Sequence, residues 1–338
     1  MSNFWIGSHE FRDSKASQSP YILAEIGLNH NGDIGLASEM VSAAADSGVN
    51  GVKFQSYFTE EFLRPSLTDA YQIFKSCELS PDEFEQLKTQ AEGLGLNFIS
   101  TPLTYSYVKI LNQMDVVAFK VASCDMTYYD LIEEITLTGK PVIISTGMSL
   151  FSEIKDLMSQ DFLKDYPVIL LHCISNYPPK LEDVHLRTIL SFQDEFKVPI
   201  GLSDHTLGTA VGIGATALGV QFIEKHFTID RNLEGPDQKM SMLPEDMKRL
   251  VNDSNDLFKA LGQKGRPELT SERDVREIAR RGLYARQSIA IGDILGNENA
   301  VFLRPPNSVD SRNVRLNKRV FKANESLEGE ICNTQINP

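Results

Sequence analysis

The stretch PIGLSDHTLGTAVGIGATALGVQFIEKHFTI at residues 199–229 decides the fold. It begins and ends with short runs typical of buried strands, PIGLSDHT and QFIEKHFTI, and a helical pattern at 209–218 separates them. A strand, a helix and a second strand in this order form a βαβ unit, in which the two strands lie in parallel. The stretch therefore predicts one repeat of an α/β fold.

The same alternation extends in both directions from this stretch. Six further strand-like runs precede it: YILAEIGLN from residue 21, GVKFQSY from 51, NFISTP from 97, VVAFKVAS from 116, PVIISTGM from 141 and VILLHCIS from 168. Helical patterns occupy 36–47, 81–94, 105–113, 128–138, 183–196 and 244–261. Eight strands alternating with helices predict a (β/α)8 TIM barrel. A doubly wound sheet is the alternative, but the chain lacks the GxGxxG sequence that usually accompanies it.

The character of the sequence changes after the barrel pattern ends. We expect the barrel to occupy residues 1–262 and the charged segment 263–281 to be a linker. Residues 282–338 contain short strand-like runs broken by Gly-Asp and Asn-Glu turns, which predicts a small β domain. A domain of this size has little core of its own, so we expect it to dock on a neighbour.

Composition excludes several classes of partner. The net charge of −13 argues against nucleic acid and anionic membranes, because binding them requires a basic face. The four cysteines show no CxxC pairing, which favours reduced thiols. The first residues do not resemble a signal peptide, and no apolar run approaches the roughly 20 residues of a membrane span. We therefore expect a cytoplasmic protein.

Three adjacent residues, Ser203, Asp204 and His205, have the composition of a hydrolase triad. Successive side chains of a strand point to opposite faces, so Asp204 points away from its two neighbours. Each member of a triad must hydrogen-bond to the next, which this alternation prevents. We therefore reject the triad.

His205 and His226 are 21 residues apart, which places them at similar heights on adjacent strands. Two neutral imidazoles side by side predict a site for a divalent metal with positions left open for a substrate. The alternative is a pair of core histidines bonded to the backbone. His172 is a possible third ligand, although we favour a supporting position for it.

Polar residues gather at the predicted carboxyl ends of the strands, where barrel enzymes place their sites. They are Glu25, Lys53, Gln55, Thr101, Lys120, Ser123, Ser145, Ser175, Ser203 and Glu224. Two lysines among hydroxyls suit a phosphate better than the imine of an aldolase, which needs one desolvated lysine. The alternative for each lysine is a salt bridge to a carboxylate such as Glu25. Asp237, in the loop after the eighth strand, either orients a substrate hydroxyl or begins a helix.

The chain resembles the sialic acid synthase family. The resemblance rests on AEIGLNHNGD from residue 24, GVKFQSY, FISTP from 98, FKVAS from 119, ISTGM from 144, LLHCISNYP from 170, GLSDHTLG from 201, and IEKHFTID from 223 with EGPDQK from 234. It spans nearly the whole chain. It implies a TIM barrel followed by an antifreeze-like domain, and condensation of phosphoenolpyruvate with N-acetylmannosamine and water to give N-acetylneuraminate and phosphate.

The resemblance also implies roles for individual residues. His205 and His226 would bind Mn²⁺ or Mg²⁺, and Glu25 and Asp125 would act in catalysis. Arg304 would reach the barrel of the other subunit in a domain-swapped homodimer. The phosphoenolpyruvate pocket would comprise Lys53, Thr101, Lys120, Ser123, Ser145 and Ser203, with Ser175 and Tyr177 near it. The contacts to the acyl sugar would be Glu25, Gln55 and Asp237.

Two positions depart from the family pattern. Ser123-Cys124-Asp125 stands where the family usually has Ser-Gly-Glu, and Gln238 stands where many relatives have histidine. These departures keep a weakened sugar-binding homologue open as an alternative. Two further alternatives are a legionaminate or pseudaminate synthase acting on a diacetamido-trideoxyhexose, and a metal-dependent aldolase that uses free pyruvate.

Overall fold

The computed structural model describes residues 3–12, 16–309, 311–312, 314–316, 320–331 and 335–337. The chain divides into two compact units, Met1–Gly262 and Gln263–Pro338. Cys77, Cys124 and Cys173 are free thiols, and Cys332 lies outside the described residues. No helix in the described part of the chain is long and apolar enough to cross a membrane.

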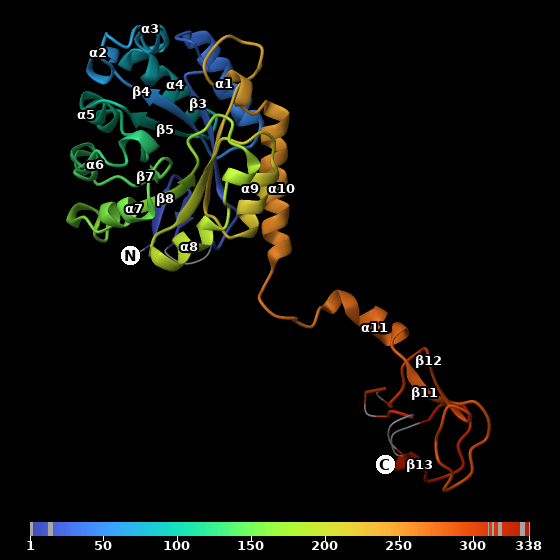
Figure 1. The fold of residues 1–338 in the computed structure, drawn as a ribbon. Helices are drawn as coiled ribbons and strands as arrows, with labels where there is room; N and C mark the ends of the chain where they lie inside the picture. Colours follow the sequence, from blue (N-terminus) through green and yellow to red (C-terminus); the bar gives the residue numbers. More distant parts are fainter. Residues whose placement is uncertain are drawn as a thin grey trace. The chain divides into compact units, whose positions relative to one another are not determined.

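The first unit is a closed barrel of eight parallel strands, which confirms the predicted fold (Figure 1). Each strand pairs with the next along the chain, and the last pairs with the first. The strands are β3 (Tyr21–Gly27), β4 (Gly51–Ser56), β5 (Asn97–Pro102), β6 (Phe119–Val121), β7 (Val142–Ser145), β8 (Val168–Cys173), β9 (Ile200–Asp204) and β10 (Phe222–His226). All eight fall within the predicted runs.

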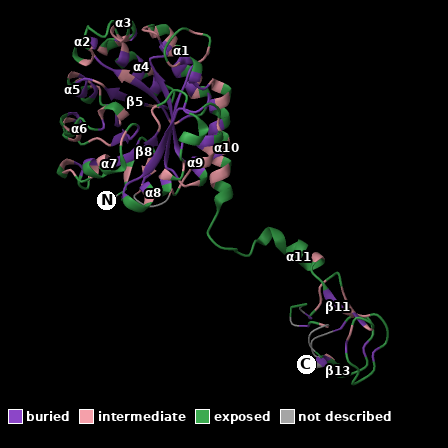
Figure 2. Cartoon of the chain, viewed as in Figure 1, coloured by how far each residue is buried: buried purple, intermediate pink, exposed green. Residues whose placement is uncertain are grey.

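Helices surround the barrel and bury its outer face. They are α1 (Ile34–Asp46), α2 (Thr59–Phe62), α3 (Thr68–Cys77), α4 (Pro81–Gly93), α5 (Tyr105–Gln113), α6 (Tyr129–Thr136), α7 (Phe151–Met158), α8 (Thr188–Glu195), α9 (Ala210–Ala217) and α10 (Pro244–Leu261). The sequence patterns did not predict α2, α3 and α7. Alternate residues of each strand, such as Val52, Phe54 and Phe98, pack outward against these helices in one continuous core. Figure 2 shows that the barrel strands are buried, whereas the helices around them are partly exposed.

The barrel interior has an apolar floor. Leu23, Ile143 and Ile169 point inward from their strands and form a second cluster with the amino-terminal hairpin. This hairpin pairs β1 (Phe4–Ile6) with β2 (His9–Phe11). Its Phe11 ring lies 6.1 Å from Tyr21, the first residue of β3, so the hairpin closes the amino-terminal end of the barrel.

The second unit is small and β-rich, as predicted. It contains α11 (Arg273–Ala279) and two antiparallel pairs, β11 (Gly282–Ala285) with β12 (Ala300–Leu303) and β13 (Lys322–Ala323) with β14 (Ile336–Asn337). Its own apolar cluster includes Leu283, Leu295, Val309, Leu327 and Ile331.

Candidate active site

The polar residues at the carboxyl end of the barrel alternate along each strand between the barrel interior and the outer layer. Ser203 donates a hydrogen bond to Glu224 Oε1 at 3.0 Å, inside the barrel. Asp204 points the other way and forms a buried ion pair with Lys225 at 2.7 Å. The Asp204 carboxylate also accepts a hydrogen bond from the Thr206 hydroxyl at 2.7 Å. The alternation used to reject the triad is therefore present in the structure, with Asp204 in the outer layer.

Four buried charges meet inside the barrel above its apolar floor. Lys53 Nζ lies 2.7 Å from Glu25 Oε2 and 3.8 Å from Glu224 Oε2. Lys120 Nζ lies 3.8 Å from the same Glu224 oxygen. Gln55 donates to the other oxygen of Glu25 at 3.2 Å. Glu224 therefore holds the two ammonium groups near one point. Each lysine forms a salt bridge to a buried carboxylate, which is the alternative that the sequence left open.

The two carboxylates of this cluster differ in proton affinity. Burial opposes ionisation of Glu224, but the ammonium groups of Lys120 and Lys53 outweigh it and lower the pKa of Glu224. Burial raises the pKa of Glu25, and Lys53 offsets only part of this effect. Two carboxyl groups with pKa values shifted in opposite directions suit different tasks, one a fixed charge and the other a proton carrier.

Hydroxyl groups accept further hydrogen bonds from the two lysines. Lys53 donates to Thr101 Oγ1 at 3.2 Å, and Lys120 donates to Ser145 Oγ at 2.7 Å. Lys120 also donates to its neighbouring backbone carbonyl, that of Val121, at 3.0 Å. The predicted hydroxyls on β5 and β7 therefore lie beside the predicted lysines.

A small polar cradle lies next to these groups, between the ends of β6, β7 and β8. The Gly147 amide donates to Ser123 Oγ at 3.0 Å. A Cβ added to Gly147 would lie 2.1 Å from Ser175 Oγ and 2.9 Å from Ser123 Oγ, so only glycine fits there. Ser175 Oγ is buried without a hydrogen-bond partner, which leaves a donor directed into the cradle.

The predicted histidine pair is also brought together. The ring centroids of His205 and His226 are 5.3 Å apart, and the Tyr177 ring packs 4.2 Å from His205. His205 Nδ1 lies 2.9 Å from the carbonyl oxygen of Ile174, so its Nε2 is left for another ligand. His226 Nδ1 is buried without a hydrogen-bond partner and lies 3.7 Å from Asp237 Oδ2.

These donors fit a divalent metal with few protein ligands. Burial lowers the pKa of His226 to about 4, and a neutral imidazole is the form that binds metals. A carbonyl holding the far nitrogen of His205 is the usual second contact of a metal-binding histidine. Within the described residues, no group of three or more His, Cys, Asp and Glu side chains is arranged to hold an ion. The remaining positions would have to come from substrate and water.

His172 faces the other way and contributes nothing to this pair. Its Nε2 lies 2.7 Å from the carbonyl oxygen of Val184, and its ring packs edge-on against Phe192 in the outer layer. Cys173, the next residue, takes the inward position and lies 3.9 Å from His205 Nδ1. The possibility of His172 as a third ligand was therefore wrong, because strand parity turns it outward.

Asp125 lies in a short 3-10 helix, Ser123–Asp125, that follows β6. The Cys124 thiol donates to its carboxylate at 3.7 Å. Burial raises the pKa of Asp125 above its ordinary value. The residue is thus placed beside the cradle of Ser123 and is suited to hold a proton.

The loop that carries Asp237 is fastened to the loop that follows β3. Gln238 is fully buried, and its amide donates to the carbonyl oxygen of Asn29 at 2.7 Å. Its carbonyl oxygen accepts from the Thr228 hydroxyl at 2.5 Å. Asn31 adds a bond to the carbonyl oxygen of Glu234 at 2.6 Å. Gln238 therefore braces two loops, rather than standing as a polar group open to a ligand.

Arg304 is an exposed residue of the second unit and follows β12. Its proposed role across a dimer stays a prediction. Conversely, two inward residues had no assigned role in the sequence interpretation: Glu224, noted only for its strand-end position, and Cys173. Strand parity alone would have placed both inside the barrel.

Comparisons with known proteins show the family of this chain. Residues 40–266 match the NeuB family. An uncharacterized protein of Methanocaldococcus jannaschii is 45% identical over 92% of both chains. The N,N'-diacetyllegionaminic acid synthase of Legionella pneumophila is 35% identical over 86% of both chains. The crystal structure of N-acetylneuraminic acid synthetase from Leptospira borgpetersenii, in complex with citrate, superposes with a TM-score of 0.76 at 34% identity and covers 81% of this chain and 95% of that one.

Proposed function

Because the chain belongs to the NeuB family, we propose that it is a nonulosonate synthase that joins phosphoenolpyruvate to an N-acylated amino sugar. The observation that carries the proposal is the position of Lys53 and Lys120, each 3.8 Å from one oxygen of Glu224, beside the His205–His226 pair. This arrangement joins an anion pocket to a site for a carbonyl compound.

The lysine end suits phosphoenolpyruvate. Buried ammonium groups attract its phosphate and carboxylate, and the hydroxyls of Thr101, Ser145 and Ser175 supply directed hydrogen bonds. The lysines are engaged with Glu25 and Glu224 and are not isolated in an apolar pocket, which disfavours an imine mechanism with free pyruvate.

The histidine end suits the open-chain aldehyde of the sugar. His205 and His226 would hold Mn²⁺ or Mg²⁺, which when bound polarises a carbonyl oxygen. Asp237, in the loop braced by Gln238, would accept hydrogen bonds from sugar hydroxyls. The Tyr177 ring packs against the His205 ring at this end.

The reaction forms a carbon–carbon bond from C3 of phosphoenolpyruvate to the aldehyde carbon. Water then adds at C2, and the resulting tetrahedral carbon expels phosphate by breaking its C–O bond. Glu25 and Asp125, whose pKa values burial raises, are the groups suited to take and return the protons of water and of the new hydroxyl.

Two sugars are candidates. N-acetylmannosamine would give N-acetylneuraminate, the product named for the structural relative. The similarity to a diacetyllegionaminic acid synthase favours a diacetamido-trideoxyhexose as the second candidate.

A second copy of the chain would complete the site. Exposed apolar side chains stand on the loops after β6, β7, β8 and β9, around the barrel mouth: Tyr128, Met148, Leu150, Tyr177, Leu181 and Leu207. A rim of this kind needs a cover. We propose a domain-swapped homodimer in which the partner's second unit, with its Arg304, provides it. Free thiols at Cys77, Cys124 and Cys173 support a cytoplasmic location.

Phosphate release tests the function. The purified chain is incubated with phosphoenolpyruvate, Mn²⁺ and either sugar, and free phosphate is measured. Release that requires one of the sugars supports the proposal and identifies the substrate. Sugar binding without phosphate release would indicate a binding protein, and turnover with pyruvate in place of phosphoenolpyruvate would indicate an aldolase.

A further inference from the structure

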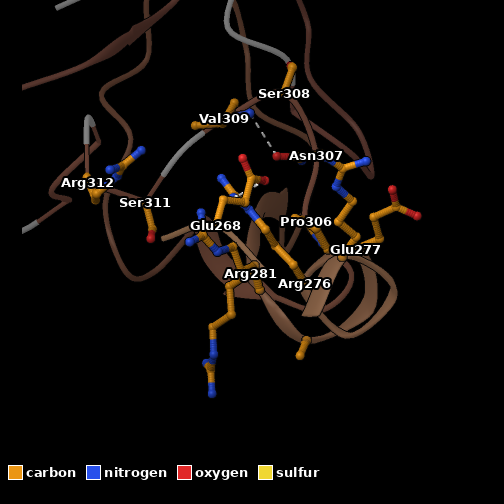
Figure 3. Close-up of a pocket in the computed structure, with 13 residues that line it drawn as sticks. Glu268, Arg276, Glu277, Arg281, Pro306, Asn307, Ser308, Val309, Ser311 and Arg312 are labelled. Carbon is orange, nitrogen blue, oxygen red and sulfur yellow. Dashed lines mark hydrogen bonds and ion pairs between the residues drawn. The ribbon is translucent and has the colours of Figure 1, made fainter. Parts of the chain in front are cut away.

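The second unit contains a cavity of about 780 Å³. It lies between α11 with the segment after it and the loop formed by residues 306–309 and 311–312 (Figure 3). All lining residues belong to the second unit, so the cavity is separate from the barrel. Its volume is in the range of pockets that bind small molecules, which is roughly 300–1,000 Å³.

The lining is strongly basic. Its charged residues are the arginines Arg273, Arg276, Arg280, Arg281 and Arg312 and the glutamates Glu268 and Glu277. One glutamate is already engaged, since Glu268 lies 3.3 Å from Arg276. Among the described lining residues, arginines thus outnumber carboxylates by three, or by two without Arg312, which already has a partner. Figure 3 shows several of these side chains around the same space. Guanidinium groups bind phosphate oxygens through paired hydrogen bonds.

One wall of the cavity is held rigidly by Asn307. Its amide donates to the carbonyl oxygens of Leu283 and Ile331 at 2.7 and 3.1 Å. Its oxygen accepts from the Val309 amide at 3.0 Å. A Cβ on Gly282 would come within 2.5 Å of Asn307, so this close approach needs glycine. The loop is therefore anchored to the core of the unit before any ligand binds, which reduces the entropy lost on binding.

The two units of the chain differ in the sign of their charge. Residues 263–338 contain 13 Lys and Arg against 10 Asp and Glu, whereas residues 1–262 contain 20 against 36. The second unit is thus basic in a chain whose net charge is −13. A small anion bound in the cavity experiences mainly the local field of the arginines.

We propose that this cavity binds a small phosphate compound with several negative charges, at a site distinct from the phosphoenolpyruvate pocket. Even without Arg312, the excess of two guanidinium groups matches the charge of a diphosphate better than that of a single carboxylate. The proposal does not depend on the activity of the barrel.

Isothermal titration calorimetry of the full chain with inorganic pyrophosphate tests it. The titration is done in Lys120→Met, so that the barrel pocket contributes little heat. In this background, Arg276→Gln combined with Arg280→Gln should weaken pyrophosphate binding at least tenfold, since each charge-assisted bond contributes roughly that factor. Arg286→Gln is the matched control, because Arg286 is exposed in the same unit and does not line the cavity. Circular dichroism confirms that the variants fold.

Four results would overturn the proposal. They are no pyrophosphate binding in Lys120→Met, an equal loss in Arg286→Gln, and citrate binding as tightly as pyrophosphate. The fourth is that Arg276→Gln combined with Arg280→Gln lowers the dimer fraction in sedimentation and leaves the affinity for pyrophosphate unchanged. This result would show that the cavity binds a second copy of the chain. None of these results bears on phosphate release by the barrel, so the two proposals fail independently.

Discussion

The buried amide of Gln238 donates to the carbonyl oxygen of Asn29 at 2.7 Å, which fastens the loop after the last barrel strand to the loop after the first. Asp237 precedes Gln238, so the brace fixes the carboxylate that faces His226. A residue that is distant from the reacting atoms can thus determine how the sugar is held.

Gln238→Ala should raise the KM for the sugar about tenfold and leave the KM for phosphoenolpyruvate unchanged, because only the Asp237 loop is released. Stability should fall by about 1–3 kcal/mol, since buried partners lose their hydrogen bonds. Steady-state kinetics and urea unfolding measure the two effects. Gln86→Ala, at an exposed glutamine of α4, is the control. Equal changes in both KM values would argue against a brace specific to the sugar.

Lys120→Met should raise the KM for phosphoenolpyruvate about 100-fold, because a buried ammonium group can make two charge-assisted bonds to the substrate. Phosphate release at varied phosphoenolpyruvate concentration gives this value. Lys109→Met, at an exposed lysine of α5, should have no effect. An unchanged KM in Lys120→Met would remove Lys120 from the anion pocket.

Asp204→Asn should destabilise the fold by about 3 kcal/mol, because it leaves the buried Lys225 ammonium group without its partner. The kcat of the folded fraction should stay within twofold of that of the unaltered chain. Chemical unfolding and kinetics at low temperature separate the two quantities. A loss of kcat with unchanged stability would return Asp204 to the chemistry and revive the triad.

His226→Ala should lower the affinity for Mn²⁺ at least tenfold and abolish turnover, with little change in circular dichroism. Calorimetry with Mn²⁺ alone measures the affinity without relying on activity. His185→Ala, at an exposed histidine, is the control. Mn²⁺ binding of undiminished strength would place the metal elsewhere.

His30 should make the fold sensitive to acid. Burial lowers the pKa of His30 to about 4, from 6.5 for a free histidine. The unfolded chain therefore takes up a proton that the folded chain resists, so stability is complete above pH 6.5 and falls as the pH drops toward 4. The shift corresponds to about 3 kcal/mol. His30→Asn, which keeps an acceptor for the Gly32 amide, should flatten the pH dependence of urea unfolding between pH 4 and 6.5. Burial also lowers the pKa values of His9 and His226 to about 4, so some dependence will remain. An unchanged profile would contradict the assignment.

The barrel could be predicted because all eight strands are apolar runs with clear ends. The residues that face the interior at the barrel mouth could be predicted because successive side chains of a strand alternate between the two faces of the sheet. Other elements lacked such signals. Helix α2 has only 4 residues and no side-chain cap, so it leaves no periodic pattern in the sequence. The β1–β2 hairpin depends on packing against Tyr21 and Phe222, which sequence neighbours do not reveal. Likewise, the burial of Gln238 depends on Asn29, 209 residues away.

The hairpin that closes the floor has a kinetic consequence. Because the barrel interior is closed at its amino-terminal end, ligands enter and leave only at the carboxyl end. The ligand that binds deepest must therefore bind first and leave last. Lys120 and Ser145 are each 2% exposed, whereas Tyr177, which packs against His205, is 52% exposed. Under the proposed chemistry, the fold therefore imposes an order of binding and release. Phosphoenolpyruvate binds before the sugar, and phosphate leaves after the sugar acid.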